Sequence, residues 1–204
     1  MRVWLGAWAL ILTTAGMAAH GTDRPTPDER MVIVYGKADG AASGWAINTI
    51  RPAGWTSDCC QYARAIGVNL VMYRGDWTGE PDRVIVLNVW PRKLPTLEAE
   101  WQDDRKHYLQ VDPAGKFEAF SVMPDPKKGM TCSGGIYHGT DRVDDVVVFC
   151  DPGKATGIHL SWSMTLASTG ADRAQVLDQF RQVVEQSFYM KYVGGPEQTG
   201  KAKR

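Results

Sequence analysis

The chain has 204 residues, of which 44% are hydrophobic and 23% charged, so it is long enough for one globular domain with a sizeable core. Lys and Arg together number 23, as do Asp and Glu, and the formal net charge is zero. This balance creates no strong field for nucleic acid or for an acidic membrane surface. We therefore expect no nucleic acid partner.

The first 19 residues have the organisation of a secretory signal peptide. Arg2 supplies a positive charge, Val3–Leu12 forms an apolar core, and the small residues that follow suit cleavage. The apolar run is about half as long as a membrane span requires. We predict cleavage near Ala18 or Ala19 and a periplasmic or secreted protein with no stable membrane anchor.

The rest of the chain is expected to form one folded unit. Residues 20–30 are polar and contain two prolines, which is typical of a flexible leader. Residues 193–204 are expected to form a disordered tail. The stretch 31–192 contains no internal repeat, and it is predicted to be a single α+β domain.

The first elements are two short strands and a helix. Met31–Tyr35 and Gly44–Ile50 are apolar runs on either side of a glycine-containing turn, which predicts a strand pair. Thr56 or Ser57 is expected to cap a short helix. This helix should end at Gly67, because a left-handed residue is usual at that position.

A hairpin follows, formed by Val68–Arg74 and Arg83–Trp90. Both runs are rich in β-branched and aromatic residues, and Gly, Asp and Pro turn residues separate them. Apolar side chains occupy both alternating faces. The hairpin should therefore lie in the middle of a sheet, with a layer packed on each side.

The middle of the chain predicts a second helix and three more strands. The helix runs from Leu97 to about Leu109, with Thr96 as its N-cap and two acidic residues in its first turn. Phe117–Met123, Cys132–His138 and Val146–Cys150 are the strand candidates, separated by loops rich in Pro, Gly and Asp.

The clearest strand is Ile158–Leu166, in which apolar and polar residues alternate at every position. This period of two predicts one face in the core and one polar face. If no helix covers the polar row, it is an open surface, bordered by the hairpin aromatics Tyr73 and Trp77, that could bind a partner or ligand. The alternative is that the row simply meets water. The row consists of His159, Ser161, Ser163 and Thr165.

A third helix is predicted from Ala171 to about Met190, where a broad apolar stripe fits a sheet-covering helix. Thr169 with Asp172 resembles a capping box. Together, these elements predict an α+β fold with a single antiparallel sheet of about six to eight strands flanked by helices.

The order of elements resembles the antiparallel α/β sandwich of the PsbP-like proteins, a fold also found in small exported bacterial proteins. The matching features are Gly54-Trp55, the hairpin, Pro95-Thr-Leu-Glu at the start of the middle helix, and the closing FRQVVEQSF at 180–188. The resemblance implies a binding or assembly protein rather than an enzyme. The cysteines are not part of this pattern.

Four cysteines remain after cleavage, and in an exported protein they are expected to pair. In the register of a hairpin about residues 139–143, Cys132 lies directly opposite Cys150, and we predict this disulfide. Adjacent Cys59 and Cys60 can join each other only through a strained eight-membered ring, which disulfide geometry disfavours. The competing pairing ties one of these two residues to Cys132 or Cys150.

The sequence contains no G-x-S-x-G, P-loop, dinucleotide fingerprint or H-E-x-x-H, and we expect no cofactor. The histidines lack metal-ligand spacing, so no metal site is predicted, and His138 and His159 are interpreted as surface residues. Asp103-Asp104 and Asp144-Asp145 are adjacent in sequence and therefore do not face one another. We interpret both pairs as solvated.

These observations favour an exported, non-enzymatic domain of the bacterial cell envelope that binds an envelope protein or a small-molecule ligand. The alternative is a thiol-dependent or hydrolytic enzyme that uses Cys59 or Cys60 with a histidine, since a thiol at a helix N-terminus is activated.

Overall fold

The computed structural model describes residues 28–40, 42–77 and 81–193. The predicted signal peptide, most of the leader and residues 194–204 of the tail lie outside this part of the chain. The helices are α1 (Tyr62–Ala65), α2 (Leu97–Val111) and α3 (Arg173–Gln186). The strands are β1 (Met31–Gly36), β2 (Trp45–Ile50), β3 (Trp55–Asp58), β4 (Leu70–Arg74), β5 (Arg83–Pro91), β6 (Lys116–Phe120), β7 (Thr131–His138), β8 (Val143–Asp151), β9 (Ile158–Ala167) and β10 (Phe188–Lys191).

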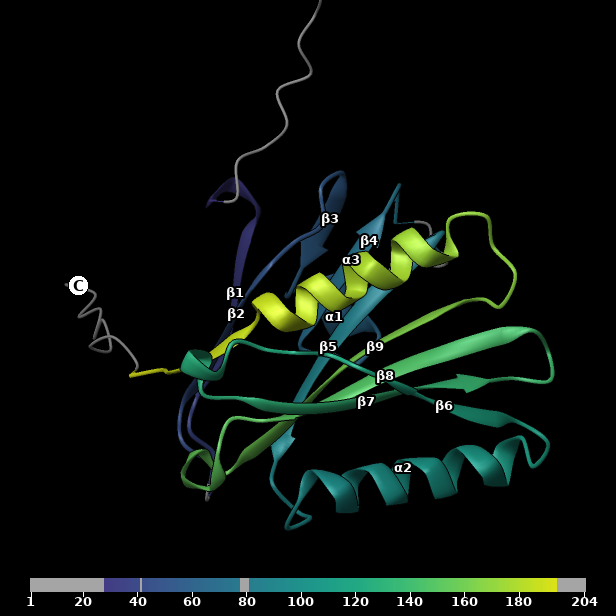
Figure 1. The fold of residues 1–204 in the computed structure, drawn as a ribbon. Coiled ribbons are helices and arrows are strands. Elements are labelled where there is room, and N and C mark those ends of the chain that lie inside the picture. The colour runs from purple at the N-terminus through teal and green to yellow at the C-terminus, as the bar shows by residue number, and fades with distance from the viewer. Residues whose placement is uncertain (1–27, 41, 78–80, 194–204) are drawn as a thin grey trace, which may run out of the picture.

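The described strands form two antiparallel sheets (Figure 1). The larger has seven strands in the order β3-β4-β5-β9-β8-β7-β6, and the smaller has three in the order β1-β2-β10. The α+β class, the antiparallel pairing and the size of the main sheet confirm the sequence prediction. The expectation of a single sheet was wrong, because the first strand pair recruits β10 into a sheet of its own.

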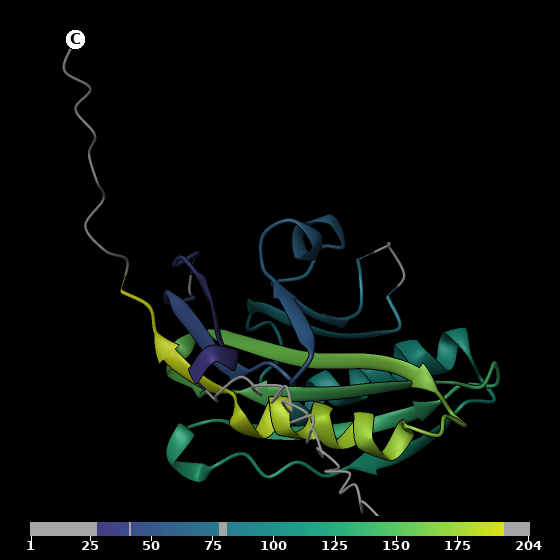
Figure 2. The same cartoon turned by 90° about the horizontal axis from the view of Figure 1, so that it is seen from above.

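Helices cover both faces of the large sheet (Figure 2). On one face, the apolar row of β9 packs with Val176, Phe180 and Val184 of α3 in the main core, in which Leu160 and Trp162 have no exposed surface. On the other face lie α1 and α2, each over a smaller apolar cluster. The hairpin strands β4 and β5 contribute to both faces, which confirms their predicted place inside the sheet.

The segment after Gly54 departs from the prediction. Residues 55–58 form strand β3, paired with β4, instead of beginning a helix at Thr56 or Ser57. Trp55 is only 2% exposed, and its burial in the main core holds this segment in the sheet. The turn is instead capped by the carboxylate of Asp58. Gly67 has a φ of +75°, as expected for the residue after a helix end.

The third helix is shorter than predicted, and no capping box begins it. It ends at Gln186, and Phe188–Lys191 turns into β10, which pairs with β2. The Asp172 side chain makes no cap hydrogen bond. It pairs instead with Arg74 and Arg83 of the hairpin, at 3.3 and 3.0 Å.

The second helix confirms its predicted start. Thr96 is the N-cap, and its hydroxyl oxygen accepts a hydrogen bond of 3.1 Å from the Ala99 N–H. Among the described helices, none is long and apolar enough to cross a membrane.

Candidate functional site

The polar row of β9 is divided into a covered half and an open half. His159 has no exposed surface and Ser161 is 8% exposed. Ser163 is half-buried and Thr165 is exposed. The condition that no helix covers the row is therefore not met at His159, which contacts Glu100 of α2, and Ser161 beside it is also buried.

His159 anchors α2 to the sheet. Its Nδ1 lies 2.6 Å from Oε1 of the buried Glu100, and its Nε2 lies 3.7 Å from Oδ2 of Asp151. Arg92 also pairs with Asp151. The interpretation of His159 as a surface residue was wrong, because Glu100 gives the imidazole a partner inside the protein. His138 is half-buried between Glu118 and Asp144.

The open half of the row lies in a pocket between α2 and the large sheet. Its volume is about 390 Å³. Ser163 and Thr165 line it together with apolar residues of the neighbouring strands. The other lining residues are Val84, Val86, Asp104, His107, Tyr108, Val111, Tyr137, Asp145, Val146, Val147 and Met164.

Two half-buried carboxylates line this pocket. The Tyr137 hydroxyl donates a hydrogen bond of 2.9 Å to Asp104. Burial raises the pKa of the Asp104 carboxyl above its usual range, and this hydrogen bond offsets the effect only in part. Burial also raises the pKa of Asp145, and the negative charges of Asp141, Asp104 and Asp144 add to the rise. The side-chain carboxylate of Asp145 accepts no hydrogen bond from any residue in the described part of the chain.

Two tyrosines add an aromatic wall. The rings of Tyr108 and Tyr137 stack with their centroids 4.3 Å apart. Burial and the neighbouring Asp104 charge raise the pKa of Tyr137, so its hydroxyl stays protonated and donates to that carboxylate. The site thus combines stacked aromatic rings, aliphatic side chains and two negative groups.

Tyr73 and Trp77 lie on the same face of the sheet but do not line the pocket. They form a cluster with Tyr62, whose ring stacks on that of Trp77 with the two ring centroids 4.8 Å apart. Val84 and Val86 pack against this cluster and also line the pocket. The predicted aromatic border therefore lies beside the open half of the polar row.

The interpretation of the adjacent aspartates as solvated was wrong for three of the four. Asp104 and Asp145 are half-buried in the pocket lining, and Asp144 has no exposed surface. Asp144 accepts a hydrogen bond of 2.6 Å from Ser168 and pairs with Arg173. A signal for Asp104 was present in the sequence, because it lies three residues after Trp101 on the apolar stripe of α2.

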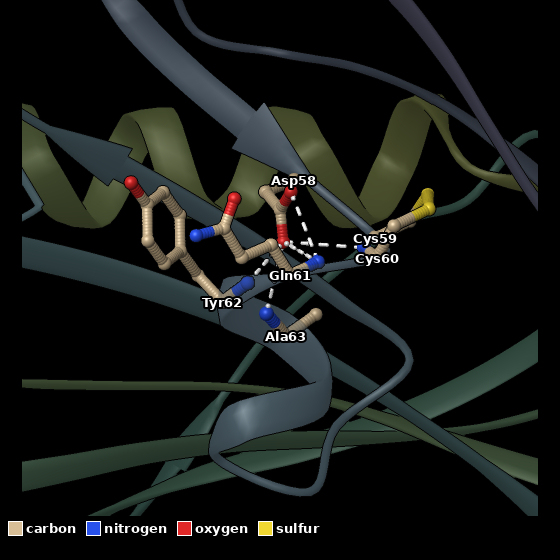
Figure 3. Close-up of a disulfide and its surroundings, with 6 residues drawn as sticks. All are labelled: Asp58, Cys59, Cys60, Gln61, Tyr62 and Ala63. Carbon is tan, nitrogen blue, oxygen red and sulfur yellow. Dashed lines mark hydrogen bonds between the residues drawn. A yellow bond between two sulfur atoms is a disulfide. The ribbon is translucent and has the colours of Figure 1, made fainter.

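The predicted disulfide between Cys132 and Cys150 is confirmed. The two residues are direct partners in the pairing of β7 with β8, and their Cα atoms are 4.1 Å apart. Cys59 and Cys60 form a second disulfide between neighbouring residues (Figure 3), so the expectation that they would not join each other was wrong. Their turn brings the two side chains to the same side of the backbone.

The sulfurs of Cys59 and Cys60 are oxidised in the structure, so neither is the free thiol that the alternative enzyme hypothesis requires. Cys59 and Cys60 are bonded to each other. The described His138 and His159 contact carboxylates. Within the described ranges, no group of three or more His, Cys, Asp or Glu side chains is placed to hold a metal ion.

No protein-family model matches the chain, and no curated protein matches it significantly. Among solved structures, it is similar to the PsbP protein CyanoP of Synechocystis sp. PCC 6803, with 15% identity and a TM-score of 0.46, over 77% of this chain and 96% of that one. It is also similar to the Ran-binding protein Mog1p of Saccharomyces cerevisiae, with 13% identity and a TM-score of 0.45, over 69% and 88% of the two chains.

LpqN of Mycobacterium tuberculosis, described as involved in cell envelope biogenesis, is a third similar structure. It has 13% identity and a TM-score of 0.45, over 80% of this chain and 93% of that one. The PsbP-like resemblance suggested by the sequence is thus found again among solved structures as a likeness of fold. At this level of similarity, it says nothing about what the chain binds.

Proposed function

We propose that this chain is a non-enzymatic domain, exported to the bacterial cell envelope, that binds a small ligand in the pocket between α2 and the large sheet. The observation that carries the proposal is the pocket itself, in which a tyrosine wall and two half-buried carboxylates meet. The signal-peptide pattern of residues 1–19 supports export.

The pocket chemistry favours an organic cation with an apolar body. Burial and neighbouring negative charges disfavour the ionised forms of Asp104 and Asp145, and an ammonium group beside them would relieve that repulsion. The π face of the half-buried Tyr108, which lines the pocket, also attracts cations. Val84, Val86 and Val147 provide apolar surface for the hydrocarbon part, and a volume of about 390 Å³ lies in the range of small-ligand sites.

The test is titration calorimetry with three probes of similar size but different charge. Phenethylamine is positive, phenylacetate is negative and phenylethanol is neutral at pH 7. We expect only the amine to bind well, with a Kd on the order of 1 mM, because a probe this small makes few contacts. Comparable binding of phenylacetate, or no binding of the amine, would contradict the proposal.

Two variants locate the binding site. Asp145→Asn should weaken amine binding about tenfold, because it removes one charge-assisted contact. Asp103→Asn changes an exposed carboxylate on α2 that does not line the pocket, and amine binding should remain unchanged. An equal effect of both variants would indicate a general electrostatic attraction rather than a site.

A protein partner is the second candidate, favoured by the outer face of β1. Every second side chain of this edge strand is exposed: Met31 by 50%, Ile33 by 48% and Tyr35 by 59%. Three large exposed apolar side chains in a row are characteristic of a partner surface. An envelope protein retained by the wild type should be lost with Ile33→Lys and kept with Met123→Lys, a variant at another exposed apolar residue. If the Ile33→Lys variant still retained that envelope protein, this face would be excluded as the partner-binding surface.

A further inference from the structure

The disulfide between Cys59 and Cys60 lies on the surface, in the turn between β3 and α1 (Figure 3). Both residues are exposed. The sulfur atoms point away from the hydrogen bonds around Asp58. An external thiol can therefore approach the bond without any movement of the sheet.

The backbone of this turn is held by Asp58 rather than by the sulfurs. Its Oδ1 accepts hydrogen bonds from the N–H groups of Cys60, Gln61, Tyr62 and Ala63, at 2.7 to 3.2 Å. Partial burial acts to raise the pKa of this carboxyl, but these four donors lower it below its usual range. The carboxylate therefore stays ionised, and its hydrogen bonds hold the turn without involving either sulfur.

The two disulfides of the chain differ in what they contribute to folding. Cys132 and Cys150 are 18 residues apart and join neighbouring strands, and Cys150 has no exposed surface. Cys59 and Cys60 enclose no intervening residue, so their bond restricts the unfolded chain very little. A bond that is exposed and contributes little to stability is suited to reversible chemistry rather than to stapling.

The surroundings also favour exchange at this bond. Cys59 and Cys60 line a groove of about 490 Å³ together with Arg64 and exposed side chains of β1. A guanidinium group nearby stabilises a thiolate. The Asp58 charge, which would oppose a thiolate, is engaged by four N–H donors.

We propose that the Cys59–Cys60 bond is a thiol–disulfide exchange site that accepts two electrons from a dithiol reductant, whereas Cys132–Cys150 is structural. A thiolate of the reductant attacks one sulfur, forms a mixed disulfide and releases the other cysteine as a thiolate, which takes a proton. The second thiol of the reductant then attacks the mixed disulfide and releases the first cysteine. The protein gains two thiols and the reductant becomes a disulfide.

The experiment is reduction of the folded protein by dithiothreitol, followed by an acid quench, labelling with N-ethylmaleimide and peptide mapping. Cys59 and Cys60 should both become labelled at least about tenfold faster than Cys132 and Cys150, because attack requires access to the sulfur. Equal rates, earlier reduction of Cys132–Cys150, or labelling of Cys59 and Cys60 without reductant would each overturn the proposal.

Two variants separate exchange from unfolding. The double variant Cys59→Ser/Cys60→Ser should keep the wild-type melting temperature, because Asp58 still holds the turn. Cys60→Ser should leave a Cys59 thiol that reacts with an aromatic disulfide reagent in the folded protein. A double variant that unfolds, or a Cys59 thiol that reacts only in denaturant, would show that this bond is structural.

Discussion

Nδ1 of His159 lies 2.6 Å from Oε1 of Glu100, and this contact joins α2 to β9 inside the protein. Since α2 forms one wall of the pocket, the contact also positions the pocket. We predict that Glu100→Ala lowers the free energy of unfolding by about 3 kcal/mol, because it leaves a fully buried imidazole without its partner. Denaturant titration measures this loss.

The control for this prediction is Glu98→Ala on the same helix. Glu98 is exposed and accepts a hydrogen bond from Gln102, one turn further along, so its loss should cost about 0.5 kcal/mol or less. Similar losses for both variants would mean that the buried contact adds no specific stability.

The second prediction concerns the pH dependence that Asp145 causes. The native state raises the pKa of this carboxyl, whereas the unfolded chain has the usual value. Stability should therefore fall as pH rises from the usual aspartate range through the native pKa. Asp145→Asn removes this penalty, so the variant should melt at a higher temperature than the wild type at pH 7, and the difference should vanish near pH 3.

A melting temperature of Asp145→Asn below that of the wild type at pH 7 would contradict this prediction. Together with the expected loss of amine binding, the variant would exchange function for stability, as is common at binding sites. The matched control, Asp103→Asn, should change the melting temperature by about 2 °C or less.

The third prediction compares the two disulfides. Cys132→Ala/Cys150→Ala should lower the free energy of unfolding by about 3 kcal/mol in the chain-entropy description, because the bond closes a loop between residues 18 apart. Cys59→Ser/Cys60→Ser should change it by less than about 1 kcal/mol. Guanidinium unfolding of both variants tests this, and the reverse order of losses would refute it.

The fourth prediction concerns the cap of the β3–α1 turn. Asp58→Ala removes the acceptor of four backbone N–H groups and should cost about 1 kcal/mol. Because the native pKa of Asp58 is lowered, its contribution is present above the usual aspartate range and is lost as pH falls through the native pKa. Asp58→Asn keeps one acceptor oxygen and should lower the free energy of unfolding less. If Asp58→Ala lowered it equally at pH 3 and at pH 7, the capping role of the carboxylate would be contradicted.

Several features could be predicted from the sequence because their causes are local. The alternation in Ile158–Leu166 assigns each side chain to a face, since successive residues of a strand point in opposite directions. The turn at 139–143 sets the hairpin register and so places Cys132 opposite Cys150. Thr96 caps its helix through a bond to a residue only three positions away.

Other features depended on contacts between distant segments. Phe188–Lys191 continues the amphipathic pattern of α3, yet it becomes a strand because β2, some 140 residues earlier, offers an unpaired edge. Trp55 draws its segment into the sheet by burial in the core, which outweighs the helix-cap preference of Thr56. Local propensity differs by a few tenths of a kcal/mol per residue, and burying one large side chain outweighs it.

The pocket likewise combines features that could be predicted from the sequence with features that only the tertiary structure decides. From the sequence, β9 has a polar face with Ser163 and Thr165 on it, and the structure agrees. Only the tertiary structure decides that α2 crosses that face, covers His159 and brings Asp104 to the same cavity as Asp145. The position of a helix over a sheet is set by the packing of side chains such as Trp101, Tyr137 and Phe149, and Trp101 meets the other two only when α2 packs on the hairpin of β7 and β8, which comes later in the chain.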